Sequence, residues 1–189
     1  MQTRCACFGF THGEQVMDIF TTLHTRRSIR SYDEGEVSRE ELHALLDAAM
    51  IAPSAGNARP WQFVVITDKD ILGKIPAINQ YAAMAAKAPL GITVCGDTRL
   101  EKYSGFWVQD CSAAVQNMLL AATALGLGAV WTGIHPIRER VAAFQSLLSL
   151  PPTVIPLAHI VIGRHCAKTE EKHRFEEAKV HYNAYREKD

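Results

Sequence analysis

Strand-like and helix-like segments alternate along the chain, which predicts a single domain of layered α/β or α+β architecture. Short apolar runs at 61–67, 90–95, 129–134 and 155–163 have the length and the bounding turn residues of strands. Between them, apolar residues recur at spacings of three and four, the period of an amphipathic helix. A chain of 189 residues is long enough for one such domain with a substantial core.

Two helices are expected before the first strand. A helix-like run begins at Met17 and leads into a basic segment. Ser38 and Glu41 have the spacing of a capping box, which marks the start of a second helix. This helix should stop before Pro53, because proline lacks the backbone N–H that a helix interior requires.

The later helices are marked by small residues and by prolines. Residues 68–88 suggest short helices broken near Pro76, and residues 104–125 suggest the longest helix, whose small side chains suit close packing at the centre of the fold. Pro136 stands where the first residue of another helix is expected, and Pro151 closes that helix.

The two ends of the chain differ from its middle. Residues 1–16 show no apolar period, so we expect an appendage outside a single domain that spans 17–189. Residues 168–189 are polar, charged and too poor in apolar residues to fold alone. This tail needs a surface to lie on, either on a second subunit or on its own subunit.

The composition excludes several classes of protein. Lysine plus arginine equal aspartate plus glutamate at 20 each, so no global field draws the chain to nucleic acid or to an anionic membrane. Five cysteines without paired spacing indicate neither a zinc site nor a disulfide scaffold, and they favour a reducing compartment. The first residues lack the apolar stretch of 7 to 15 residues that a signal peptide would have, and no later run reaches about 18 apolar residues. We expect a soluble cytoplasmic protein with no metal, no nucleic-acid partner and no membrane contact.

The first chemical candidate is the basic segment Arg26-Arg27-Ser28-Ile29-Arg30. In an extended conformation Arg26, Ser28 and Arg30 project to one side, because side chains alternate with period two. Two guanidinium groups and a hydroxyl match the three acceptor oxygens and the charge of a phosphate monoester. A solvated basic turn is the alternative.

The second candidate is the loop 53–60, which is rich in proline and small residues. Gly56 leaves the backbone accessible, and Asn57 supplies both a donor and an acceptor. Such a loop can lie flat against a planar heterocycle. An ordinary connection between a helix and a strand explains the same composition.

Two further candidates lie later in the chain. Trp131, Thr132 and Gly133 end a predicted strand, where glycine permits close approach of a ligand and tryptophan can line a pocket wall. Lys172-His173-Arg174 in the tail offers more phosphate donors. The alternatives are a core tryptophan and a solvated run of charges.

Together these four segments resemble the nitroreductase family of FMN enzymes, from Met17 to about Asn183. Members of that family carry an Arg-Arg/His-Ser-x-Arg/Lys motif after a short helix, then an Ala/Ser-Pro-Ser-x-x-Asn-x-x-Pro-Trp loop, and a strand end with glycine against the flavin. The closing Val180–Asn183 is similar to the C-terminal signature of the smaller members. The resemblance implies a central, mostly antiparallel sheet flanked by helices, with the C-terminal segment exchanged in a homodimer.

The resemblance also implies how FMN is bound. The basic turn and the tail hold the phosphate, the loop contacts the ring from the partner subunit, and the strand end lies near flavin N5. The implied cofactor-binding residues are Arg26, Arg27, Ser28, Arg30, Pro53, Ser54, Ala55, Asn57, Trp131, Thr132, Gly133, Lys172 and Arg174. No side chain is expected to be catalytic, because the chemistry takes place at N5.

The implied function is electron transfer from NADH or NADPH to a small acceptor such as a nitroaromatic or a quinone, by a ping-pong mechanism. A storage or redox-sensing module that binds flavin without turnover is the rival, and within the enzymes a flavin-destroying or dehalogenating relative stays open. The chain departs from the family pattern at Arg59, where many relatives have glutamine, and at Thr132, where several larger relatives have glutamate. Arg164 replaces a frequent aromatic residue and is a candidate for a further phosphate ligand.

Overall fold

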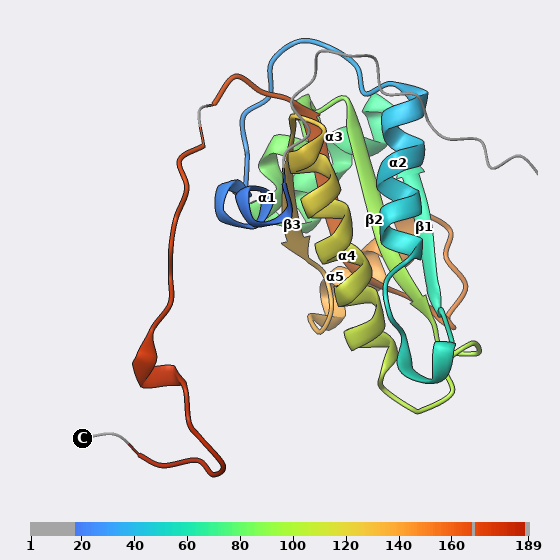
Figure 1. Ribbon diagram of the computed structural model, residues 1–189. Helices are drawn as coiled ribbons and strands as arrows, with labels where there is room; N and C mark the ends of the chain where they lie inside the picture. The colour runs from blue at the N-terminus through green and yellow to red at the C-terminus, as the bar shows by residue number, and fades with distance from the viewer. Residues whose placement is uncertain (1–17, 168, 188–189) are drawn as a thin grey trace, which may run out of the picture.

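A four-stranded antiparallel sheet forms the centre of the computed structural model, which describes residues 18–167 and 169–187 (Figure 1). The strands lie in the order β1-β2-β4-β3, and each neighbouring pair is antiparallel. This arrangement confirms the expected sheet. The expected appendage, 1–16, lies outside the described residues. The strands are β1 (Trp61–Ile66), β2 (Leu90–Asp97), β3 (Leu127–Gly133) and β4 (Val154–Arg164).

Helices cover both faces of the sheet, so the domain has three layers. On one face lie α2 (Arg39–Met50) and α4 (Trp107–Ala124), with the short α1 (Ile19–Thr25) against α4. The opposite face carries α3 (Lys69–Ile78), α5 (Arg138–Leu147) and the 3-10 segment η2 (Gln80–Lys87). Two single 3-10 turns complete the set, namely η1 (Ala55–Asn57) and η3 (Glu177–Lys179).

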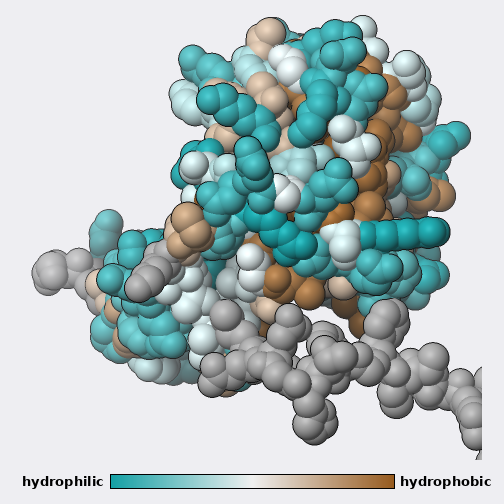
Figure 2. Space-filling model, turned by 90° about the horizontal axis from the view of Figure 1, so that it is seen from above, coloured by the Kyte–Doolittle hydropathy of each residue, from teal (hydrophilic) through white to brown (hydrophobic). Residues whose placement is uncertain are grey.

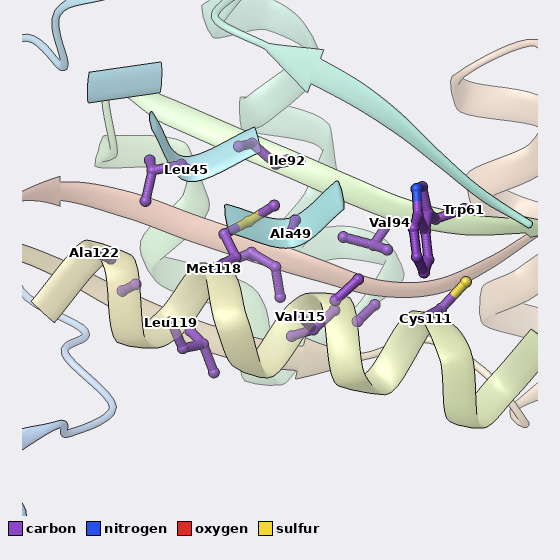
Figure 3. Close-up of a cluster of buried hydrophobic side chains, with 14 of the residues drawn as sticks. Leu45, Ala49, Trp61, Ile92, Val94, Cys111, Val115, Met118, Leu119 and Ala122 are labelled. Atoms are coloured by element: carbon purple, nitrogen blue, oxygen red, sulfur yellow. The ribbon is translucent and has the colours of Figure 1, made fainter. Parts of the chain in front are cut away.

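Helix α4 packs along the sheet through one continuous apolar stripe. Cys111, Val115 and Met118 are buried at spacings of four and three, and they face Ile92 and Val94 of β2 (Figure 3). The helix itself was predicted from its spacing of apolar residues, and the stripe that it buries runs along one face. The capping box of Ser38 and Glu41 is also confirmed, since each side chain accepts from the other residue's backbone N–H.

Two expected helix boundaries were wrong. Pro76 does not break α3, which continues to Ile78 and ends where Asn79 adopts an extended conformation. Asn79 is buried, and its side chain caps the following turn by accepting from the backbone N–H of Tyr81. Pro136 is not the first residue of α5, which begins at Arg138. A side-chain cap and a longer turn thus determine these boundaries, rather than the prolines.

The C-terminal tail leaves the body of the domain as an extended chain (Figure 1). Phe175, Tyr182 and Tyr185 are each more than 70% exposed on it. Apolar side chains also gather in a band on the face of the molecule shown in Figure 2. No helix within 18–167 or 169–187 combines the length and hydropathy needed to cross a membrane. The tail buries its aromatic rings only if another surface covers them.

Candidate functional site

The basic turn is fixed against the outer edge of β3. Helix α1 ends before Arg26, and the backbone N–H of Ile29 donates to the carbonyl of Ala129 over 3.0 Å. This bond forms part of an isolated parallel bridge between Ser28 and Ala129. The Ser28 and Arg30 side chains are exposed, and that of Arg26 is partly buried. The structure thus brings the expected phosphate donors to one strand edge.

The turn carries positive charge that no acidic side chain neutralises. Within the described residues Arg26, Arg27, Arg30 and Arg174 form no ion pair. Burial lowers the pKa of the Arg26 guanidinium, and the positive charges of Arg27 and Arg174 lower it further. Guanidinium groups that repel one another in a partly buried place are stabilised by an anion. The donor set therefore fits a phosphate group.

The tail reaches this turn through backbone contacts. The Lys172 N–H donates to the His24 carbonyl over 3.1 Å, and the Lys172 carbonyl lies 3.1 Å from His24 Nδ1. Arg27 donates to the carbonyls of His24, Arg26 and Glu170. These contacts fix the position from which Arg174 acts on Arg26. They occupy Arg27 within its own subunit, so fewer of its donors remain for a ligand.

The strand end at Gly133 presents backbone groups to the same open edge. Backbone groups of an antiparallel edge strand face outward at every second residue. The Ala129 carbonyl points away from β4, because it accepts from the Ile29 N–H of the basic turn. The carbonyls of Trp131 and Gly133, two and four residues later on β3, therefore also point away from β4. The Trp131 side chain is 37% exposed. This is the strand end at which the sequence predicts the close approach of a ligand.

Two buried residues, Thr132 of β3 and His159 of β4, are hydrogen-bonded to each other next to the strand end. Thr132 is buried, and its hydroxyl donates to the His159 carbonyl over 2.7 Å. The His159 ring is fully buried, its Nδ1 lies 2.9 Å from the Thr93 hydroxyl, and its Nε2 has no partner among the described residues. Burial lowers the pKa of His159 to about 4, so the ring is neutral near pH 7.

The Gly133 carbonyl accepts hydrogen bonds from two side chains that were not among the predicted site residues, those of Asn79 and Arg140. The Asn79 amide donates to it over 3.2 Å and the Arg140 guanidinium over 3.0 Å. The Arg140 guanidinium also lies 5.6 Å from the centre of the Tyr81 ring. These residues stand 54 and 7 positions from Gly133, and no local motif marks them.

The loop between α2 and β1 adopts a backbone conformation that is unfavourable for most residues. Gly56, Asn57 and Arg59 have φ angles of 59°, 55° and 49°, all in the left-handed region. For a residue other than glycine, this region costs roughly 1–2 kcal/mol. The Ser54 hydroxyl accepts from the Arg59 N–H over 3.0 Å and closes the loop. The exposed Asn57 and Pro53 are thus presented on a loop of defined shape.

The loop and the basic turn lie far apart within one subunit. The loop packs at the beginning of α4, where the Ala55 N–H donates to Asp110. The turn lies at the other end, where Arg27 and Thr123 line one small cavity. Asp110 and Thr123 are thirteen positions apart on α4, which is about 20 Å at 1.5 Å per residue. One subunit does not bring these two parts of the predicted site together.

Arg164 has a structural partner. Its guanidinium donates to both carboxylate oxygens of Glu41 over 2.7 Å, which ties β4 to α2. This salt bridge occupies the donors that a phosphate would need. A cavity of about 600 Å³ lies nearby, between Thr67 and Leu90 on the side of β1. Residues 33–37 also line this cavity, and none of the predicted cofactor-binding residues does. Within 18–167 and 169–187, no three His, Cys, Asp or Glu side chains cluster as metal ligands would.

Comparison with known proteins identifies the family. The nitroreductase family model matches residues 23–92 and 81–164. A "Putative NADH dehydrogenase/NAD(P)H nitroreductase" of Methanothermobacter thermautotrophicus is 47% identical over 87% of this chain and 86% of its own length. The chain belongs to the nitroreductase family.

Solved structures agree with this assignment. An "FMN-dependent Nitroreductase" of Clostridium difficile matches with a TM-score of 0.80 and 28% identity, over 87% of this chain and 98% of its own. "A putative nitroreductase in complex with fmn" from Desulfovibrio desulfuricans matches with a TM-score of 0.74 and 32% identity, over 89% of this chain and 98% of its own.

The buried His159 predicts a loss of stability in acid. Its pKa is lower in the folded state than the value of about 6.5 in the unfolded chain, so the unfolded chain binds the proton first. The free energy of unfolding should fall by about 2 kcal/mol between pH 7 and pH 5 and level off below pH 4. Urea unfolding at one protein concentration measures this loss. His159→Gln should remove it, whereas His43→Gln, at an exposed position, should retain it. An unchanged pH slope in His159→Gln contradicts the assignment.

Proposed function

We propose that the chain is an FMN-dependent oxidoreductase that uses NADH or NADPH to reduce a small organic acceptor, such as a nitroaromatic or a quinone. The observation that carries the proposal is the cluster of unneutralised guanidinium groups at the open edge of β3. Family membership supports it, as does the solved relative in complex with FMN. Bound FMN would supply the chemistry, by accepting a hydride and passing electrons on.

The residues of this chain would bind and orient the cofactor. Arg26, Ser28 and Arg174 would hold the phosphate, with Lys172 beside them on the tail. Arg30, which is exposed near the strand edge, would place its positive charge at the pyrimidine end of the ring. Such a charge favours an electron-rich ring through electrostatic stabilisation. The outward backbone groups of Trp131 would meet the central part of the ring, together with the N–H of Gly133, whose carbonyl is already held by Asn79 and Arg140.

Donor and acceptor would use one open space in turn, which gives ping-pong kinetics. Within the described residues, no three His, Cys, Asp or Glu side chains are placed to hold a metal ion. The buried thiols support this view, because burial raises the pKa of Cys95 and of Cys111 to about 12 and keeps both protonated. The reaction would then depend on the placement of the cofactor rather than on a protein nucleophile.

The active unit would be a homodimer in which each flavin contacts both chains. The loop at 53–59 and the basic turn are separated within one subunit, so a second chain would bring its own loop to the turn. An apolar groove between α1, α2 and α4 offers an interface, with Ile19 57% and Ile51 79% exposed beside it. The extended tail with its exposed aromatic rings would cover part of the partner. Obligate dimers of this kind bury more than about 2,000 Å².

Anaerobic stopped-flow mixing separates an enzyme from a flavin-storage module. When the FMN-loaded protein meets NADH or NADPH, its visible flavin absorbance should disappear at about 1 s⁻¹ or faster, as typical turnover requires. Adding a quinone should restore the absorbance. If neither nicotinamide removes the colour within several minutes, the protein binds flavin without reductase turnover.

The phosphate assignment predicts a selective loss of affinity in Arg26→Ala. FMN binding should weaken about 10- to 100-fold, because one or two charged hydrogen bonds of roughly 1.5–3 kcal/mol are lost. Riboflavin lacks the phosphate, so its affinity should not change. Fluorescence titration of the apo-protein measures both, with Arg39→Ala, at an exposed position on α2, as the control. Equal losses for FMN and riboflavin would place the phosphate elsewhere.

A further inference from the structure

Two hydrogen bonds tie the loop segment 54–59 to the rest of the described chain. The Ala55 N–H donates to Asp110 Oδ1 over 2.9 Å, and the Gly56 carbonyl accepts from the Lys102 ammonium. The segment's other hydrogen bonds close it on itself. The N–H groups of Asn57 and Ala58 donate to the carbonyls of Ser54 and Ala55, and the Arg59 N–H donates to the Ser54 hydroxyl. The position of the whole loop therefore depends on these two contacts.

Asp110 is the buried member of this pair. It lies in the first turn of α4 and is 5% exposed, whereas Lys102 is exposed. Its second oxygen, Oδ2, is buried and accepts no hydrogen bond from the described residues. A carboxylate that is buried with one oxygen unsatisfied is costly in desolvation. What this carboxylate gains is a charge-assisted hydrogen bond to the loop backbone.

We propose that Asp110 is a positioning residue for flavin binding, because its buried carboxylate holds the 53–59 loop in the conformation that presents Asn57 to the flavin ring. The inference rests on the proposed function. The adjacent backbone explains why an anchor is needed, since Asn57 and Arg59 both adopt left-handed φ angles. Without the anchor, the loop would relax toward conformations in which Asn57 no longer faces the ligand.

Close packing around Gly56 also restricts the position of the loop. A Cβ atom at this position would lie 2.9 Å from Lys102 Cδ and 3.2 Å from Tyr103 Cε2, so the backbone there sits directly on the 100–106 segment. Asp110 and this segment contact the loop from neighbouring parts of the same chain. The exposed surface of the loop, with Asn57 and Pro53, is left for the ligand.

The variant Asp110→Asn tests the proposal because it removes the charge and keeps the shape. Affinity for FMN and for riboflavin should fall by the same factor, about 3- to 10-fold, because the loop contacts the ring that both share. The thermal midpoint of the apo-protein should stay the same or rise, because a neutral amide costs less to bury. Ser112→Ala, which loses a hydroxyl bonded within α4 to the Val108 carbonyl, is the control and should bind both flavins normally.

A double-mutant cycle with Asn57→Ala provides a second readout. If Asp110 acts through the loop, the combined variant loses less affinity than the product of the two single losses. Multiplicative losses would mean that the two residues act independently, which overturns the proposal. So would unchanged affinity for both flavins in Asp110→Asn, or a loss of affinity accompanied by a lower thermal midpoint of the apo-protein.

The comparison with Arg26→Ala shows which claim has failed. If Arg26→Ala weakens FMN alone and Asp110→Asn weakens neither flavin, the proposed function stands and the role of Asp110 is wrong. If the protein binds no flavin at all, the proposed function fails, and the role of Asp110 fails with it.

Discussion

The burial of α4 against the sheet is the constraint on which the rest of the structure depends. Cys111, Val115 and Met118 lock the helix along β2, so both of its ends have fixed positions. The first end holds the 53–59 loop through Asp110, and the last end lies beside the basic turn. A rigid helix of 18 residues cannot shorten to bring these parts together. The separation of the loop from the turn in one subunit is therefore built into the core.

The distribution of charge indicates which kind of ligand this geometry would bind. The chain has no net charge, yet four arginines near the edge of β3 have no acidic partner among the described residues. Arg164 and Arg99, in contrast, are both paired with carboxylates. The pair of Arg164 with Glu41 ties β4 to α2, whereas arginines without an acidic partner are available to an anion. The same strand edge offers outward backbone groups at Trp131, so a ligand with a phosphate and a planar ring would use both features.

Much of the fold and part of the site were predictable from the sequence, because they depend on neighbouring residues. The capping box at Ser38, the apolar spacing of α4 and the basic motif beginning at Arg26 are local patterns, and each lies where it was expected. The wrong boundaries at Pro76 and Pro136 depend on a side-chain cap and on the path of a turn. The contact of Asp110 with the loop joins positions 55 residues apart, and only the folded chain brings them together.

The central claim is that each flavin site is built from two chains, and a mixed dimer tests it most directly. One chain carries Arg26→Ala and Arg30→Ala, the other carries Ser54→Ala and Asn57→Ala, and the two are refolded together and isolated through different affinity tags. Shared sites predict one doubly damaged site and one intact site, so the heterodimer should bind one FMN per dimer with the affinity of the unmodified protein. If the heterodimer binds FMN only as weakly as its two parents do, each site lies within a single chain and the account is wrong.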